Sequence, residues 1–183
     1  NFLEKSINPN RGNKNVLVGK DGWLFFKRDN SIENYQNIKL FTKEELKRAA
    51  YYLNSIEQWA RKNGKDFYYV ISPDKNKIYG EYFPSSIYKT KPDSQSRANQ
   101  LIQYLRENTQ VKVIYLADVL KNHKEDGLLY YKNDTHWNSL GSYIGYLEVM
   151  KEIQKNNPQL PVLTNLTWKK TKHTRGDLTN LLG

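Results

Sequence analysis

The segment most informative about the fold class is Phe67-Tyr68-Tyr69-Val70-Ile71. It is a continuous run of aromatic and β-branched residues, which is typical of a strand buried on both faces of a parallel sheet. Before it, Thr42 and Glu45 form a capping-box pattern, and apolar residues recur at helical spacing up to Asn63-Gly64. A capped helix followed at once by a buried strand predicts an α/β fold.

The same alternation continues on both sides of this unit. The pattern predicts a turn at 19–22 with a strand at 23–26, a helix at 95–107, a buried strand at 111–116, a helical turn at 117–122, a strand at 128–131 and a long helix that Asn138 caps and Asn157-Pro158 ends. The sequence from Trp168 to Gly183 is polar and is expected to be irregular. Strands that alternate with helices predict a mostly parallel sheet with helices on its faces.

Three loops follow predicted strands, at residues 72–75, 116–118 and 133–137. In open α/β sheets, ligands bind beyond the carboxyl ends of the strands. We therefore expect these loops to lie at one rim and to hold the functional residues.

The most informative of these loops contains Asp134-Thr135-His136. In an extended segment, residues i and i+2 point to the same side, so the Asp134 carboxylate can reach one ring nitrogen of His136. The other nitrogen would then act as a general base for a serine nucleophile. Two alternatives remain open from spacing alone. The pair can be a structural cap of the following helix, or it can contribute two ligands to a metal site.

Other side chains near these loops are weaker candidates. Ser72 follows a strand, but Pro73 has no N–H to donate to an oxyanion, which favours a strand-ending turn. Lys75 is expected to be a surface or orienting residue rather than a base, and Trp137 can wall the site or stack on a sugar ring. Because they lie in loops of the expected rim, Ser72, Lys75 and Trp137 are still predicted to contact substrate. Gly176-Asp177-Leu178 reads as a structural turn.

Composition narrows the function classes. The 183-residue chain has no cysteine, which excludes disulfides and thiolate chemistry, and no apolar run is long enough to span a membrane. The net charge is +10, with one dense basic stretch that reads as a solvated loop: Lys169, Lys170, Lys172, His173 and Arg175. Because no nucleic-acid-binding motif accompanies the charge, we expect no nucleic-acid partner. We also expect no cofactor and no metal.

Several stretches together resemble the alginate O-acetylation protein family, the AlgX/AlgJ-like branch of the SGNH hydrolase superfamily. They are residues 18–25, Ser72-Pro73-Asp74-Lys75 with Ile78-Tyr79 and Phe83-Pro84, residues 130–141 and Gly176-Asp177-Leu178. The Asp-x-His-Trp-Asn block at 134–138 is the most specific of them, and the order of the motifs matches across nearly the whole chain.

The resemblance implies a three-layer α/β/α domain that spans residues 1–183 and lies outside the cytoplasm, in the periplasm or at the cell surface. An anchor or signal peptide upstream of Asn1 is expected. The implied activity is O-acetyl transfer to, or acetyl-ester hydrolysis on, an extracellular or cell-wall polysaccharide. The family's catalytic Asp and His correspond to Asp134 and His136, and a membrane-bound acyltransferase is the implied partner.

The sequence departs from the family pattern in one respect. The family's serine nucleophile comes later in the chain, in a Gly-Thr/Asp-Ser-type motif, and no such motif occurs before Gly183. We therefore expect the domain to be incomplete at its C-terminus, with the nucleophile beyond residue 183 and the 183 residues inactive alone. The alternative is a non-catalytic glycan-binding or scaffold module of a polysaccharide-modification complex.

Overall fold

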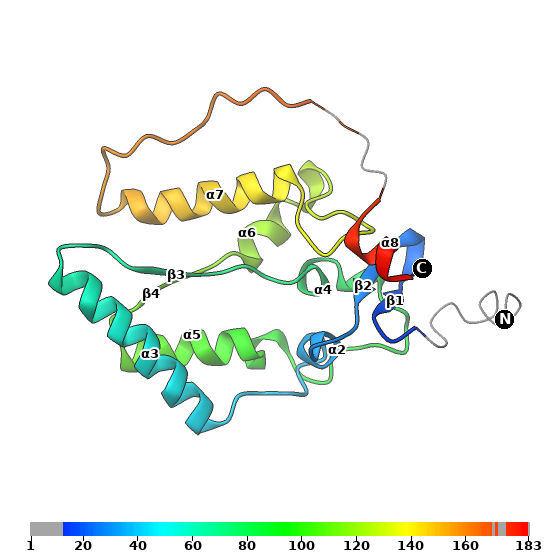
Figure 1. The fold of residues 1–183 in the computed structure, drawn as a ribbon, viewed down its shortest axis with the longest axis horizontal. Helices are drawn as coiled ribbons and strands as arrows, with labels where there is room; N and C mark the ends of the chain where they lie inside the picture. Colours follow the sequence, from blue (N-terminus) through cyan, green and yellow to red (C-terminus); the bar gives the residue numbers. More distant parts are fainter. Residues whose placement is uncertain (1–12, 170, 172–174, 183) are drawn as a thin grey trace, which may run out of the picture. The chain divides into compact units, whose positions relative to one another are not determined.

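The computed structural model describes residues 13–169, 171 and 175–182, and these divide into two compact units. The first unit combines the described parts of residues 1–29, 73–86 and 116–183, and the second comprises residues 30–72 and 87–115. Figure 1 shows the elements of both units along the chain.

The second unit is an α/β unit built on a parallel strand pair. Its elements are α2 (Ser31–Tyr35), α3 (Lys43–Lys62), β3 (Tyr68–Ile71), the 3-10 turn η3 (Asp93–Gln95), α5 (Arg97–Asn108) and β4 (Lys112–Tyr115). Tyr68 pairs with Lys112 and Ile71 with Tyr115. The core forms where Leu46 of α3 and Leu105 of α5 pack with Tyr69 and Val113 of the strands. The predicted α/β class and parallel pairing are therefore confirmed.

Local sequence signals in this unit are confirmed at the helix ends. The Thr42 side chain accepts from the Glu45 N–H, and the Glu45 side chain accepts from the Thr42 N–H, which completes the capping box. Gly64 follows α3 with a φ of +66°, a left-handed conformation that favours glycine. The predicted burial of β3 on both faces is wrong, since Val70 is 37% exposed. In the described part of the chain, β3 has one strand neighbour, β4, so it is not a central strand.

The first unit contains the remaining elements. They are β1 (Val16–Val18), the 3-10 turn η1 (Lys20–Gly22), β2 (Leu24–Phe26), α4 (Lys75–Ile78), η2 (Gly80–Tyr82), α6 (Ala117–Asn122), η4 (Lys124–Asp126), α7 (Ser139–Gln154) and α8 (Asp177–Leu182). β1 and β2 form an antiparallel hairpin in which Val16 pairs with Phe26. Trp23 is fully buried and stacks on Tyr79, with 4.3 Å between the ring centroids.

Helix α8 is a difference from the sequence prediction, which had this region irregular. Leu178 of α8 is fully buried and forms a small core with Val16 and Leu24 of the hairpin. Leu182, one turn later, packs on the same core. A six-residue helix carries too little periodicity to be read from sequence, and its stability comes from this tertiary packing.

The predicted strand at 128–131 is also wrong. Tyr130 forms a single isolated bridge with Trp137, and the residues between them turn back on themselves. Leu129 and Tyr130 are nevertheless buried, so their apolar character reflects core packing rather than a sheet. The basic stretch at 169–175 lies largely outside the described residues.

Helix α7 begins as predicted, because the Asn138 side chain accepts a hydrogen bond from the Gly141 N–H. Gly141 permits close packing, since a Cβ there would lie 2.3 Å from the Leu129 carbonyl oxygen. This packing is against the turn before α7 and not against a sheet. None of the helices in the described residues is both long enough and apolar enough to cross a membrane.

Candidate active site

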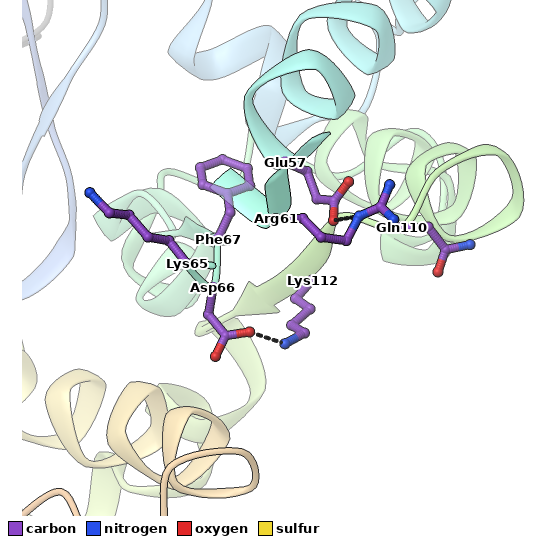
Figure 2. Close-up of a pocket in the computed structure, with 7 residues that line it drawn as sticks. All are labelled: Glu57, Arg61, Lys65, Asp66, Phe67, Gln110 and Lys112. Atoms are coloured by element: carbon purple, nitrogen blue, oxygen red, sulfur yellow. Dashed lines mark hydrogen bonds and ion pairs between the residues drawn. The ribbon is translucent and has the colours of Figure 1, made fainter. Parts of the chain in front are cut away.

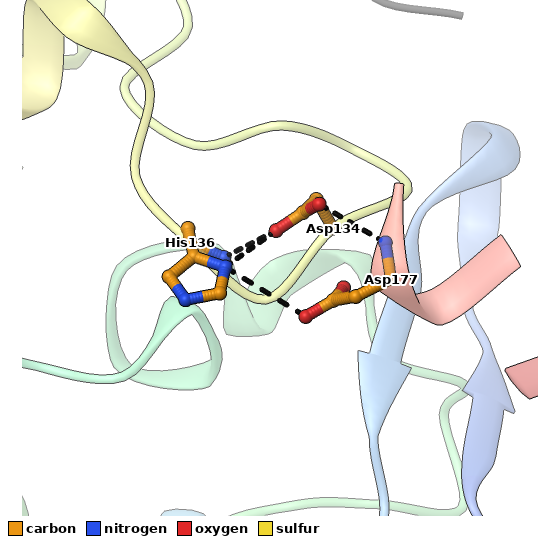
Figure 3. Close-up of side chains that lie close together, drawn as sticks. All are labelled: Asp134, His136 and Asp177. Carbon is orange, nitrogen blue, oxygen red and sulfur yellow. Dashed lines mark hydrogen bonds and ion pairs between the residues drawn. The ribbon is translucent and has the colours of Figure 1, made fainter. Parts of the chain in front are cut away.

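The turn between Tyr130 and Trp137 carries the Asp134–His136 pair. His136 Nδ1 lies 2.7 Å from Asp134 Oδ1, and the same oxygen accepts the His136 backbone N–H at 2.9 Å. The predicted i, i+2 contact is therefore confirmed. The His136 side chain is 76% exposed, and Figure 3 shows Nε2 on the side of the ring away from Asp134. The geometry holds one ring nitrogen and leaves the other accessible.

The Asp134 carboxylate is held in its ionised form. Burial by itself raises the pKa of Asp134, but the N–H groups of His136 and Asp177 and the His136 ring together lower it below its ordinary value. The Asp177 N–H donates to Asp134 Oδ2 at 3.0 Å, so both carboxylate oxygens have partners. An ionised, oriented carboxylate is what fixes the tautomer of a general-base histidine.

Asp177 is the site residue that the sequence analysis missed. Its carboxylate accepts from the Thr135 N–H at 2.8 Å and from the Thr135 hydroxyl, and its Oδ2 lies 3.7 Å from His136 Nδ1. Figure 3 shows both carboxylates on the Nδ1 side of the ring. The segment Gly176-Asp177-Leu178, which was read as a structural turn, leads into helix α8, which begins at Asp177. The only sequence signal was the presence of these residues among the stretches that resemble the family.

Lys75 lies beneath the same turn. It is 3% exposed, so the expectation of a surface lysine is wrong, although an orienting role fits its contacts. Its Nζ donates to the carbonyls of Asp134, Tyr131 and Lys132 at 2.7, 3.1 and 3.2 Å. An ammonium has three N–H groups, which matches these three acceptors. Burial lowers the pKa of Lys75 to about 7, against the opposing effect of the Asp177 and Asp134 carboxylates.

The other predicted substrate contacts lie in different surroundings. Trp137 is half-buried and packs beside α7, where a Cβ on Gly145 would lie 3.4 Å from its ring. Ser72 is exposed and belongs to the second unit. A cavity of about 370 Å³ adjoins the site turn and is lined by Gly22, Leu128, Tyr130, Tyr131, Lys132, Asn133 and Asn138.

Asp134, His136 and Asp177 also offer three ligand atoms within 4.8 Å of one another, a set that can hold a metal ion. A metal bound through Nδ1 would displace the proton that joins this nitrogen to Asp134 Oδ1. The hydrogen-bonded pair and a metal site are therefore mutually exclusive uses of the same atoms.

A second cavity, of about 310 Å³, lies in the second unit at the amino ends of β3 and β4 (Figure 2). Four of its five charged side chains form two ion pairs. Arg61 Nε lies 3.2 Å from Glu57 Oε1, and Lys112 Nζ lies 2.6 Å from Asp66 Oδ1. Parallel sheets bind ligands at the carboxyl ends of their strands, so this is not the expected location for a catalytic site.

Comparison with solved structures identifies the fold. The O-acetyltransferase domain of Pseudomonas putida AlgJ matches with a TM-score of 0.66 and 22% identity, over 92% of this chain and 58% of that one. Bacillus cereus PatB1 matches with a TM-score of 0.55 and 22% identity, over 83% of this chain and 46% of that one. PatB1 with a sulfonyl adduct matches with a TM-score of 0.53 and 24% identity, over 77% and 44%.

The chain thus spans between about two fifths and three fifths of the length of these structures. No functionally curated protein matches the sequence. The family described as the SGNH hydrolase-like domain of the acetyltransferase AlgX matches residues 16–183, which is nearly the whole chain. Motif order, fold and family match agree, and the chain belongs to the AlgX family of SGNH hydrolase-like domains.

Proposed function

We propose that this protein takes part in O-acetylation of an extracellular or cell-wall polysaccharide, with Asp134 and His136 as two members of a Ser-His-Asp triad. The observation that carries the proposal is the 2.7 Å contact between Asp134 and His136 Nδ1 on a ring that is otherwise exposed. Membership of a family named for an acetyltransferase, and the names of the AlgJ and PatB1 neighbours, support the same reaction class.

The proposed chemistry proceeds in two halves. His136 Nε2 takes the serine proton while the serine oxygen attacks the acetyl carbonyl carbon of the donor. The tetrahedral intermediate expels the donor's leaving group, which takes the proton back from His136 and leaves an acetyl-serine. A polysaccharide hydroxyl then loses its proton to His136 while its oxygen attacks the ester carbonyl; the second intermediate expels the serine oxygen, which takes that proton from His136, and the acetylated polymer leaves. Water in place of the polysaccharide gives acetate.

We place the serine outside the 183 residues. Ser139 lies in the first turn of α7 immediately after the Asn138 cap, on the same short segment as His136, and Ser72 belongs to the other unit. Ser72 follows the end of β3, but Pro73 after it has no N–H to donate to an oxyanion, and Ser139 lies on a helix rather than at a strand end. A nucleophile contributed by further sequence fits the share of the AlgJ domain that this chain covers, 58%.

We propose an extracytoplasmic location and a membrane-bound acyltransferase partner that supplies acetyl groups. Trp137 and the cavity beside the site turn, which is lined by Tyr131 and Asn133 among others, are the proposed sugar contacts. We assign Lys75 to holding the turn rather than to contacting substrate, because its donors are already used by three carbonyls.

The test replaces His136 with Ala in the full-length natural protein and measures acetate release from an activated acetyl ester. We expect a loss on the order of a thousandfold or more, because the general base is removed. His123→Ala is the matched control, since that histidine lies in the exposed turn after α6, where its partner is Asp126 at 4.0 Å. Near-normal turnover in a folded His136→Ala protein would contradict the proposal.

A glycan-binding module is the second candidate. It is favoured by an aromatic cluster on α7, where Tyr143 stacks on Tyr146 and contacts the exposed ring of Trp168 at 5.4 Å. Such surfaces stack on sugar rings. Binding of acetylated and unacetylated glycan with no acetyl transfer or hydrolysis, unchanged by His136→Ala, would favour this candidate over the enzyme.

A further inference from the structure

We propose that Asp177 is a positioning residue for the Asp134–His136 pair, and that α8 is the element that delivers it. This inference rests on the proposed function, because it gives Asp177 a role in the same site. Asp177 lies 41 positions beyond His136 in the sequence and touches the site turn through both its backbone and its side chain.

Asp177 both donates hydrogen bonds to the site turn and accepts them from it. The Asp177 N–H donates to Asp134 Oδ2 at 3.0 Å, while the Asp177 carboxylate accepts the Thr135 N–H at 2.8 Å and the Thr135 hydroxyl. Asp134 and Thr135 are therefore fixed together by one residue. Because Asp134 Oδ1 holds His136 Nδ1, the orientation of the histidine depends on this arrangement.

The packing around α8 makes this contact specific. Gly176 comes so close to the turn that a Cβ would lie 2.1 Å from the Asn133 carbonyl oxygen and 2.8 Å from Asp134 Cβ. On the other side, Leu178 is fully buried in the core with Val16 and Leu24. Asp177 is held between a glycine that allows the approach and a leucine that anchors the helix.

Asp177 also places a second negative charge near the ring. Its Oδ2 lies 3.7 Å from His136 Nδ1, on the same side as Asp134. When the base takes the serine proton, the ring becomes a cation, and a nearby carboxylate favours that form. Asp177 is therefore expected to affect the chemical step more than the binding of substrate.

The test uses Asp177→Asn in the full-length protein, with Asp126→Asn as the control. Asp126 is an aspartate of the same unit with a 62% exposed side chain, and it pairs with His123 rather than with the site. For Asp177→Asn we expect kcat for an activated acetyl ester to fall roughly 10- to 100-fold with KM within about threefold, because an interaction strongest in the transition state is weakened. Asp126→Asn should leave both constants unchanged.

A second readout does not depend on activity. The ¹⁵N signals of the His136 ring report which nitrogen carries the proton, and we expect Nδ1 to carry it in the natural protein and to lose this preference in Asp177→Asn. If Asp177→Asn fails to fold, Asp177→Glu takes its place, because the longer side chain moves the carboxylate out of its present contacts with Thr135 and away from the His136 ring. The expected change is in the same direction and smaller.

The outcomes separate the two proposals. If His136→Ala is inactive while folded Asp177→Asn keeps its kcat and its ring signals, the positioning role is overturned and the proposed function stands. If His136→Ala stays active, the proposed function falls, and the ring signals alone decide whether Asp177 positions the histidine.

Discussion

At the scale of the residue, Lys75 shows how a charge can be used structurally inside a small unit. Its ammonium lies under the site turn, 5.7 Å from the Trp23 ring centroid and 5.3 Å from that of Phe25, with three carbonyls as hydrogen-bond acceptors. The rings and carbonyls replace part of the water that the cation loses on burial. The turn that carries Asp134 is consequently held by a group that does not itself contact the histidine ring.

The burial of Lys75 predicts a pH-dependent stability. Its pKa is lowered to about 7 in the folded protein from an ordinary value of 10.5, so between these two values the unfolded chain binds more protons. The free energy of unfolding should therefore rise as pH increases from 7 toward 10, by an amount on the order of 2 kcal/mol between pH 7 and 9. At pH 7 the contribution of Lys75 to the slope is about half of its maximum, and it vanishes as the pH falls about one unit further. Urea unfolding across this range measures the effect.

The Lys75→Met protein is the control for this prediction, because it lacks the titrating group. Its free energy of unfolding should show a flatter dependence between pH 7 and 9. Lys132→Met changes an exposed lysine of the same turn and should retain the natural slope. Equal slopes for the natural protein and Lys75→Met would show that Lys75 keeps its ordinary titration.

Sequence reasoning at this scale succeeded where partners are neighbours. The contact between Asp134 and His136 was predicted from their two-residue spacing, and it is found at 2.7 Å, but in a bend rather than in the extended segment that was expected. Asp177 could not be identified this way, since nothing local links it to a residue 43 positions earlier. The burial of Lys75 could not be predicted from sequence either, because a lysine is normally exposed. The carbonyls that accept its hydrogen bonds belong to residues 131–134, more than 50 positions away in the sequence.

At the scale of the element, helix α8 connects the core to the site turn, because one side of it packs in the core and its first residue contacts the turn. Leu178 and Leu182 lie one turn apart and pack on the β1–β2 hairpin, while Asp177 at its first position meets the site turn. A helix this short has little intrinsic stability, so its position depends on the buried leucine.

We predict that Leu178→Ala lowers the free energy of unfolding by about 2–4 kcal/mol, because it leaves a cavity in a fully buried position. Leu181→Ala, on the same helix but 41% exposed, is the matched control and should cost less than about 1 kcal/mol. Urea unfolding compares the two. If Asp177 acts as proposed, Leu178→Ala also lowers turnover under conditions where the protein remains folded. Similar losses of stability in the two variants would argue against α8 as an anchored element.

The elements that the sequence predicted well are those with complete local signals. Helix α3 has its capping box and its Asn63-Gly64 end, and α7 has its Asn138 cap. Residues 128–131 were wrongly predicted as a strand, because buried apolar residues before a turn have the same composition as a strand. Helix α8 was missed because six residues carry less than two turns of periodicity.

At the scale of the whole molecule, the α/β class and the family could be predicted because the alternation of helix and strand and the order of the motifs extend over most of the chain. The family match covers residues 16–183 and so includes residues of both compact units. The nucleophile could not be predicted from residue spacing, since a triad is assembled from distant parts of a chain and its members are recognised by geometry.

If the serine nucleophile lies outside these 183 residues, as proposed, Asp134 and His136 alone cannot complete the reaction. The chain covers 58% of the AlgJ domain, and we expect the 183 residues alone to release no acetate from an activated acetyl ester, whereas a protein that continues with its natural sequence does. The physical reason is that His136 activates a serine only when its hydroxyl lies within about 3 Å of the ring nitrogen. The comparison requires both proteins to be folded, which circular dichroism and cooperative urea unfolding establish. Two substitutions in the short chain test the serines that could replace that nucleophile. Ser139→Ala removes the serine three residues after His136, and Ser72→Ala removes the one in a loop of the predicted rim. Hydrolysis by the short chain at the rate of the longer one, abolished by either substitution, would place the nucleophile within these residues and would contradict the proposed position.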